Sequence, residues 1–144
     1  MKRLVLILFI ALLPALLPAQ DELRIQLLPG HNLISCNLRM PREFFREGEN
    51  RGPNVPLMMA QLGNNIRFLG IMEDERGRFY APRLNFCNIP YWDVTDGYLL
   101  VMNQATEIVW EGERLPADMN IPMNVGWNII SYLPEYRLNH CCPK

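Results

Sequence analysis

Residues 123–133 read M-N-V-G-W-N-I-I-S-Y-L, and the same pattern occurs earlier in the chain at a constant offset of 96 positions. Each copy has an apolar approach, a glycine that suits a tight turn, and then a β-branched apolar run. The pattern predicts a duplicated unit in which two equivalent buried strands bracket the middle of one domain. The matching residues are Ile25, Leu27, Gly30, Asn32, Leu33, Ile34 and Ser35 in the first copy, and Ile121, Met123, Gly126, Asn128, Ile129, Ile130 and Ser131 in the second, with Trp127 in the place of His31.

Strand-like runs separated by turn signals fill much of the remaining chain. They predict three hairpins, formed by residues 23–28 with 32–38, 66–72 with 78–82, and 98–102 with 106–111. The second hairpin turns at the acidic residues 73–77, which we expect to form a solvated tip. Residues 112–118 are expected to be a polar connector.

Two segments do not follow a strand pattern. Residues 40–56 are rich in Arg, Glu, Asn, Gly and Pro and predict an exposed loop, with Phe44 and Phe45 as its possible anchors. Residues 56–62 start with proline and stop before Gly63, which predicts one short helix. The expected fold is therefore all-β, a small β-sandwich or partly open barrel of about eight short strands with one short helix, within a single domain at residues 21–138.

The N-terminus is typical of a secretory signal peptide. Lys2 and Arg3 precede an apolar run at residues 4–13, which is too short for a comfortable membrane span. Residues 1–20 are therefore assigned as the signal peptide, and cleavage after Ala19 or Gln20 is expected to remove the first 19 or 20 residues, with export to the periplasm, the surface or the medium of a bacterium. The chain has 14 basic and 15 acidic side chains, and cleavage leaves 12 basic ones and a net charge near −3. Without a basic stripe, nucleic acids and membrane surfaces are poor partners.

The four cysteines permit disulfides in an exported protein but do not define them. Adjacent Cys141 and Cys142 could each reach Cys36 or Cys87, so several connectivities stay open. His140 lies beside them in a tail, residues 139–144, that we expect to be disordered. No further ligand motif completes a metal site, so neither a metal nor a cofactor is predicted.

No pattern in the sequence predicts catalysis. Its two histidines are His31, at a turn, and His140, in the tail, and there is no G-x-S-x-G segment. Four rings could contact a ligand: Tyr80, Tyr91, Trp92 and Tyr98. Aromatic faces near Asn and Asp side chains are used in sugar recognition. The favoured interpretation is that these rings fill the core, and an exposed carbohydrate-binding platform is the alternative.

The order of the motifs resembles a β-rich module of secreted bacterial proteins that carries L-P-x-G-W-N-L-I-S segments. The resemblance spans nearly all of residues 23–138 and rests on L-P-G-H-N-L-I-S, E-R-G-R-F-Y-A-P, F-C-N-I-P-Y-W, D-G-Y-L-L-V-M and N-V-G-W-N-I-I-S-Y-L-P. It implies a non-enzymatic structural or adhesion-type module with other extracellular modules or surface polymers as partners. The chain departs from the family at His31, where a tryptophan is usual. It also ends at residues 139–144, where related chains continue, which suggests a truncated piece of a larger multi-module protein.

Overall fold

The computed structural model describes residues 20–134, which form two antiparallel sheets with eight strands and one short α-helix. The predicted all-β, sandwich-like fold is confirmed. The predictions for the signal peptide and for the C-terminal tail fall on residues 1–19 and 135–144, outside the described part of the chain.

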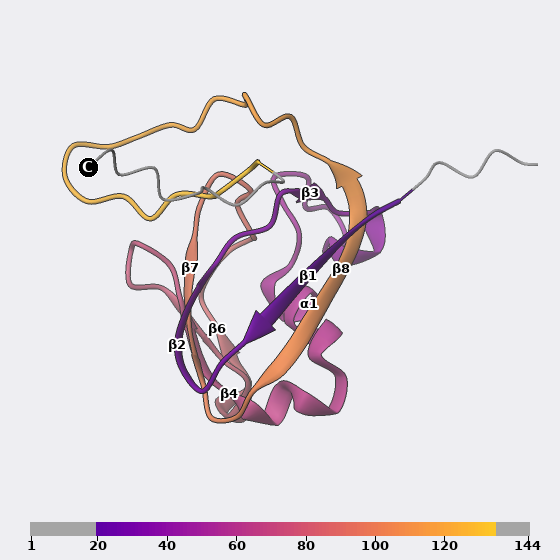
Figure 1. Cartoon of the computed structure of the whole chain (residues 1–144), viewed down its shortest axis with the longest axis vertical. Coiled ribbons are helices and arrows are strands. Elements are labelled where there is room, and N and C mark those ends of the chain that lie inside the picture. Colours follow the sequence, from indigo (N-terminus) through magenta and orange to yellow (C-terminus); the bar gives the residue numbers. More distant parts are fainter. Residues whose placement is uncertain (1–19, 135–144) are drawn as a thin grey trace, which may run out of the picture.

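The two sheets diverge from one corner of the molecule (Figure 1). The first has the order β1 (Asp21–Leu27), β8 (Thr106–Arg114), β3 (Leu38–Arg39). The second has the order β2 (Gly30–Ile34), β7 (Tyr98–Met102), β4 (Leu69–Glu73), β5 (Phe79–Ala81), β6 (Phe86–Cys87). Strands β1 and β2 are therefore both sheet edges.

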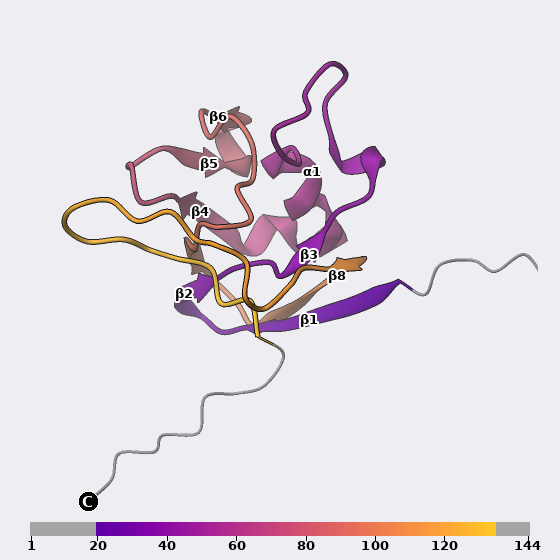
Figure 2. The ribbon, with the colours of Figure 1, turned by 90° about the horizontal axis from the view of Figure 1, so that it is seen from above.

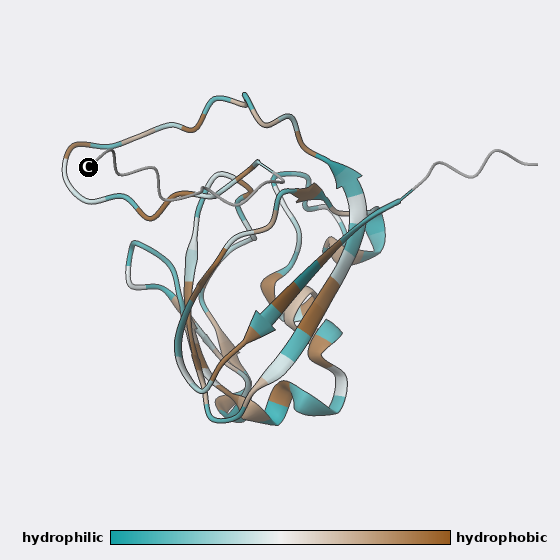
Figure 3. Ribbon diagram, in the orientation of Figure 1, coloured by the Kyte–Doolittle hydropathy of each residue, from teal (hydrophilic) through white to brown (hydrophobic). Residues whose placement is uncertain are grey.

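Alternating side chains of β1 and β8 face the core, and Figure 3 shows the corresponding hydrophilic and hydrophobic bands along both strands. Ile108 and Trp110 of β8 are fully buried. The Trp110 indole N–H donates to the carbonyl oxygen of Met58 at 3.0 Å, which satisfies the polar edge of this ring inside the core. This bond ties the helical layer to the first sheet.

The predicted short helix is confirmed as α1 (Val55–Met59), with Pro56 in its first turn. Asn54 caps it, because the side-chain oxygen accepts from the Leu57 backbone N–H at 3.3 Å. Three 3-10 segments accompany it: η1 (Arg42–Phe44), η2 (Ala60–Phe68) and η3 (Pro82–Leu84). Since η2 continues to Phe68, β4 starts at Leu69 and not at residue 66 as predicted.

The predicted hairpin around residues 73–77 is confirmed by the antiparallel pairing of β4 with β5. The tip is exposed at Arg76 and Gly77, as predicted, but Asp74 beside it is buried. The Asp74 carboxylate accepts the backbone N–H groups of Arg76 and Arg78 at 2.9 Å each and the Arg78 guanidinium at 2.6 Å. A buried carboxylate with three donors fixes the turn from inside.

The other two predicted hairpins are wrong, because in each case the two strands join different sheets. β1 pairs with β8, and β2 pairs with β7. Between β7 and β8, the Asn103 backbone N–H donates to the Phe68 carbonyl oxygen at 2.8 Å. This contact ties the connection to the end of η2, at the point where the chain crosses from one sheet to the other.

The segment at residues 40–56 is less exposed than predicted. Met40 and Phe44 are both buried, and the Asn54 N–H donates to the Phe44 carbonyl oxygen at 2.7 Å. Phe44 is therefore an anchor, as expected, and the loop closes part of the core between the sheets.

Candidate interaction surface

The four rings considered for sugar binding do not form an exposed platform. Tyr80, Trp92 and Tyr98 are buried, and Tyr91 is half-buried with the Arg51 guanidinium 4.7 Å from its ring centre. Trp92 packs on Tyr98 with ring centres 4.2 Å apart. These three rings therefore lie in the core, and only Tyr91 of the four is partly open to solvent.

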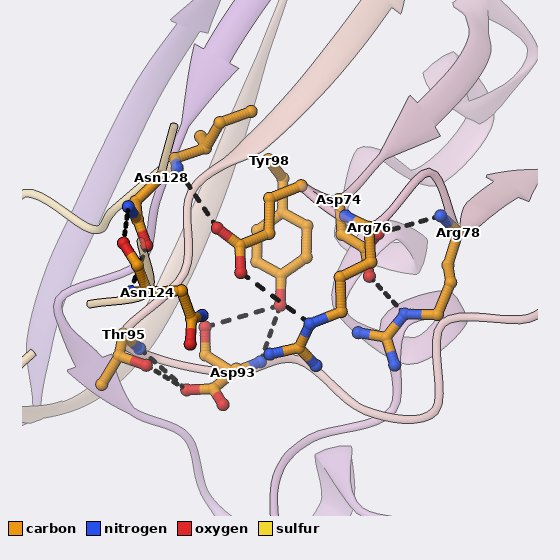
Figure 4. A network of polar contacts seen from close by, with 10 residues as sticks. Asp74, Arg76, Arg78, Asp93, Thr95, Tyr98, Asn124 and Asn128 are labelled. Atoms are coloured by element: carbon orange, nitrogen blue, oxygen red, sulfur yellow. Dashed lines mark hydrogen bonds and ion pairs between the residues drawn. The ribbon is translucent and has the colours of Figure 1, made fainter. Parts of the chain in front are cut away.

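Tyr98 also holds the loop that follows Trp92. Its hydroxyl oxygen accepts the Asp93 backbone N–H at 2.7 Å (Figure 4). Burial raises the pKa of this hydroxyl well above its usual range, so the hydroxyl stays neutral. The Asp93 carboxylate accepts from the N–H and the hydroxyl of Thr95 at 3.0 and 2.7 Å. Residues 93–97 are thereby fixed as a docking edge for the second sequence copy.

The two copies have the same turn. The Asn32 side chain accepts the Leu28 N–H at 2.8 Å and donates to the carbonyl oxygens of Leu28 and Gly30 at 2.7 and 3.1 Å. In the second copy, Asn128 makes the corresponding three bonds to Asn124 and Gly126 at 2.8, 2.9 and 3.1 Å. Gly30 and Gly126 have φ of 93° and 106°, which glycine adopts without strain. The duplication is therefore structural, at least in its turn.

The burial of the two copies differs, so the prediction of two equivalent buried strands is wrong. Leu27 and Ile34 of the first copy are 1% and 5% exposed, whereas Met123 and Ile130 of the second are 69% and 45% exposed. The first copy forms β1 and β2 and lies on two sheets. Within the described residues, the second copy forms a single isolated bridge, Asp96 to Ile130.

Proline explains part of this difference. Pro122 occupies the position that Gln26 has in β1, and Pro116 follows the end of β8 closely. Proline has no backbone N–H for a strand ladder. The two prolines therefore disfavour a strand at residues 116–124, although the repeat pattern predicts one.

We call residues 116–131 the arm. Figures 1 and 2 show it in orange and yellow as a long loop that projects from the body of the domain. At its tip, Val125 and Trp127 are 108% and 100% exposed, beside the exposed Met123. Asp118 is its one charged side chain. An exposed apolar group of this kind is a candidate interaction site.

Both ends of the arm are anchored at the same place. The Leu115 N–H donates to the Asn37 carbonyl oxygen at 2.9 Å, and the Asn37 side chain donates to the Leu133 carbonyl oxygen at 3.1 Å. Nearby, Ser35 Oγ accepts the Tyr132 N–H at 3.0 Å. The two leucines are buried. The arm thus starts and ends on the segment that follows β2.

The returning limb of the arm is also bonded to the body. The Gly97 N–H donates to the Ile129 carbonyl oxygen at 2.8 Å, and the Ser131 N–H donates to the Thr95 carbonyl oxygen at 2.9 Å. The Ile129 backbone N–H donates to the Glu75 carboxylate at 3.4 Å. Ser131 is buried. These hydrogen bonds therefore hold the returning limb, and with it the tip, against the body of the domain.

Asn128 is expected to fix the conformation of the tip. In Asn128→Ala, the Asn124 N–H loses its acceptor, and its hydrogen exchange should become about tenfold faster, as expected for one lost bond. The Leu28 N–H, held by Asn32 in the first copy, is the internal control and should exchange at an unchanged rate. NMR-detected exchange measures both. Unchanged exchange at Asn124 would contradict this role for Asn128.

The described residues offer little other chemistry. They contain no group of three or more His, Cys, Asp or Glu side chains that could hold a metal ion, and no helix long and apolar enough to cross a membrane. Cys36 and Cys87 are unpaired there, and burial raises the pKa of the Cys36 thiol to about 11. Cys141, Cys142 and His140 lie outside the described part.

Three comparisons with known proteins found no match. No protein-family model matches this chain, no curated protein is significantly similar to it, and no solved structure matches it. The resemblance to the L-P-x-G-W-N-L-I-S module stays a prediction, and the arm is the feature from which a function can be argued.

Proposed function

We propose that this chain is a non-enzymatic, exported module of structural or adhesion type, which binds a protein partner through its arm. The observation that carries the proposal is the complete exposure of Trp127 at the tip of a loop held by hydrogen bonds at its turn and at both ends. Export rests on the signal-peptide pattern of residues 1–20.

The composition of the tip favours a protein partner over a sugar. Trp127 has Met123, Asn124 and Val125 as exposed neighbours, and the nearby Asn128 side chain is already bonded within the turn. Sugar recognition needs polar groups around the ring for the hydroxyls, whereas protein interfaces concentrate their binding energy in a few desolvated aromatic and apolar anchors. Truncation of such a tryptophan costs about 2–4 kcal/mol of binding free energy.

The supported conformation of the arm also favours binding. A flexible loop loses conformational entropy when a partner orders it, and this loss weakens the complex. The Asn128 bonds and the anchored ends already restrict the arm in the free protein. Binding then costs less conformational entropy, so the same apolar contacts give a tighter complex.

The proposed function can be tested by adhesion. Beads coated with the purified chain should be retained on cells that export it, or on surfaces coated with the same chain. Trp127→Ala should weaken retention by at least about 30-fold in affinity, and Trp127→Phe should restore part of it. Leu84→Ala removes a comparably exposed apolar side chain on η3 and serves as the matched control. Absence of retention, or equal retention by Trp127→Ala, would contradict the proposal.

A further inference from the structure

In the part of the chain that the structure describes, the sandwich is open along one side, between the edge strands β1 and β2. These edge strands diverge from the turn that connects β1 to β2 (Figure 1). A groove of about 540 Å³ lies between them, and Tyr132 and Pro134, which directly follow the arm, are among its lining residues. Its apolar and polar lining includes Leu23, Ile25, Leu33, Ile34, Asn37 and Tyr132.

The burial of cross-strand pairs shows that the core is incompletely covered there. Leu23 pairs with Trp110 and Ile25 with Ile108, in register across β1 and β8. The two β8 residues are fully buried, whereas Leu23 and Ile25 are only half-buried although they face the same side. Within residues 20–134, no strand pairs with the outer edge of β1 or of β2. An extended apolar segment added at this edge would cover both side chains.

The arm, in turn, has exposed apolar side chains and, in the part of the chain that the structure describes, unpaired backbone. Its outgoing limb has no strand partner among the described residues, and its tip places Met123, Val125 and Trp127 in solvent. Its sequence repeats that of β1 and β2, two segments that do form strands. The arm cannot be covered by its own body, because both views show its tip projecting away from the sheets (Figures 1 and 2).

We propose that the arm of one copy of this chain docks in the groove between β1 and β2 of a second copy, and that the exchange is reciprocal. This inference rests on the proposed function and names its partner. Each copy offers one arm and one groove that the other residues of the range 20–134 leave uncovered, so two copies related by a two-fold axis cover both. A different partner on the arm would leave the groove open.

Charge and size are compatible with this exchange. The arm carries only Asp118, and at the groove rim Arg24 is paired with Glu22 and Glu107, so no like charges are forced together. Two arms and two grooves supply a number of residues on the order of the 20–30 per side that a standard interface uses. The interface gains apolar burial and strand-edge pairing without displacing any strand of either copy.

Sedimentation of the purified chain tests the inference from about 1 μM to about 1 mM. We expect a dimer that Trp127→Ala weakens at least about 30-fold, and that Leu33→Arg, at an exposed groove residue, weakens comparably. Leu84→Arg is the control for a charge placed on a distant exposed leucine and should leave the dimer intact. Thermal unfolding of each variant checks that the fold is retained.

A mixing experiment separates arm-in-groove docking from contact between two arms. Trp127→Ala keeps its groove and Leu33→Arg keeps its arm, so their mixture should form a heterodimer through one intact contact. A benzoylphenylalanine photo-crosslinker in place of Trp127 should label the partner within residues 22–35. A dimer insensitive to Leu33→Arg, or a mixture without heterodimer, would overturn the groove assignment.

The outcome also distinguishes this inference from the function on which it rests. A chain that stays monomeric up to about 1 mM while its beads still bind cells through Trp127 would exclude a second copy as the partner and leave the proposed function standing. Loss of both activities would overturn both proposals.

Discussion

Replacing Trp92 with alanine should lower the free energy of unfolding by about 3–5 kcal/mol, the range for truncating a buried tryptophan. Trp92 is 1% exposed and lies between Tyr98 and Trp110, with ring centres 4.2 and 5.3 Å away. Its removal leaves a cavity where the second sheet meets the first. The melting temperature should fall on the order of 10–20 °C.

The chain contains its own control for this substitution. Trp127→Ala removes an identical side chain that is fully exposed, and at about 1 μM, where the proposed dimer is dissociated, it should change the free energy of unfolding by no more than about 0.5 kcal/mol. Chemical denaturation measures both variants. Trp92→Phe keeps a ring in the cluster and should lower the free energy of unfolding by an intermediate amount. If the alanine variant does not fold, the phenylalanine variant can still be compared with Trp127→Ala. Equal costs at the two tryptophans would contradict the core assignment.

These two tryptophans show that the burial of a side chain could not be predicted from the sequence alone. The aromatic and proline-rich context of Trp92 suited either a core or a stacking surface, and the burial that distinguishes them depends on Trp110 and Tyr98, which come from two different sheets. Trp127 fits a buried turn by its repeat pattern, yet it is exposed. Whether a side chain is buried depends on which other elements pack against it, and the pattern of one sequence segment does not show those elements.

Strand pairing illustrates the same limit. The hairpin of β4 and β5 was predictable because its turn is local, with Asp74 and Gly77 inside the connecting residues. β1 instead pairs with β8, some eighty residues away in sequence, because their inward rows share the core around Trp110. The groove between β1 and β2 follows from this topology and was therefore not predictable from the sequence.

Ile34 and Ile130 allow the difference between the two copies to be measured directly. If the copies were equivalent buried strands, both alanine substitutions would cost about 2–5 kcal/mol of unfolding free energy. In the structure, Ile34 is 5% exposed and lies opposite Tyr98 in the β2–β7 ladder, whereas Ile130 is 45% exposed and makes a single bridge to Asp96. We expect the full cost for Ile34→Ala and less than about 1 kcal/mol for Ile130→Ala.

Protein concentration makes this comparison more informative. Measured by chemical denaturation at about 1 μM, where a weak dimer is dissociated, the two variants should differ as stated. At about 100 μM, a docked arm adds burial around the second copy, so the cost of Ile130→Ala should rise while that of Ile34→Ala stays constant. Equal costs at low concentration would show that the second copy is buried within a single chain, and the exposed arm would then not describe the protein in solution.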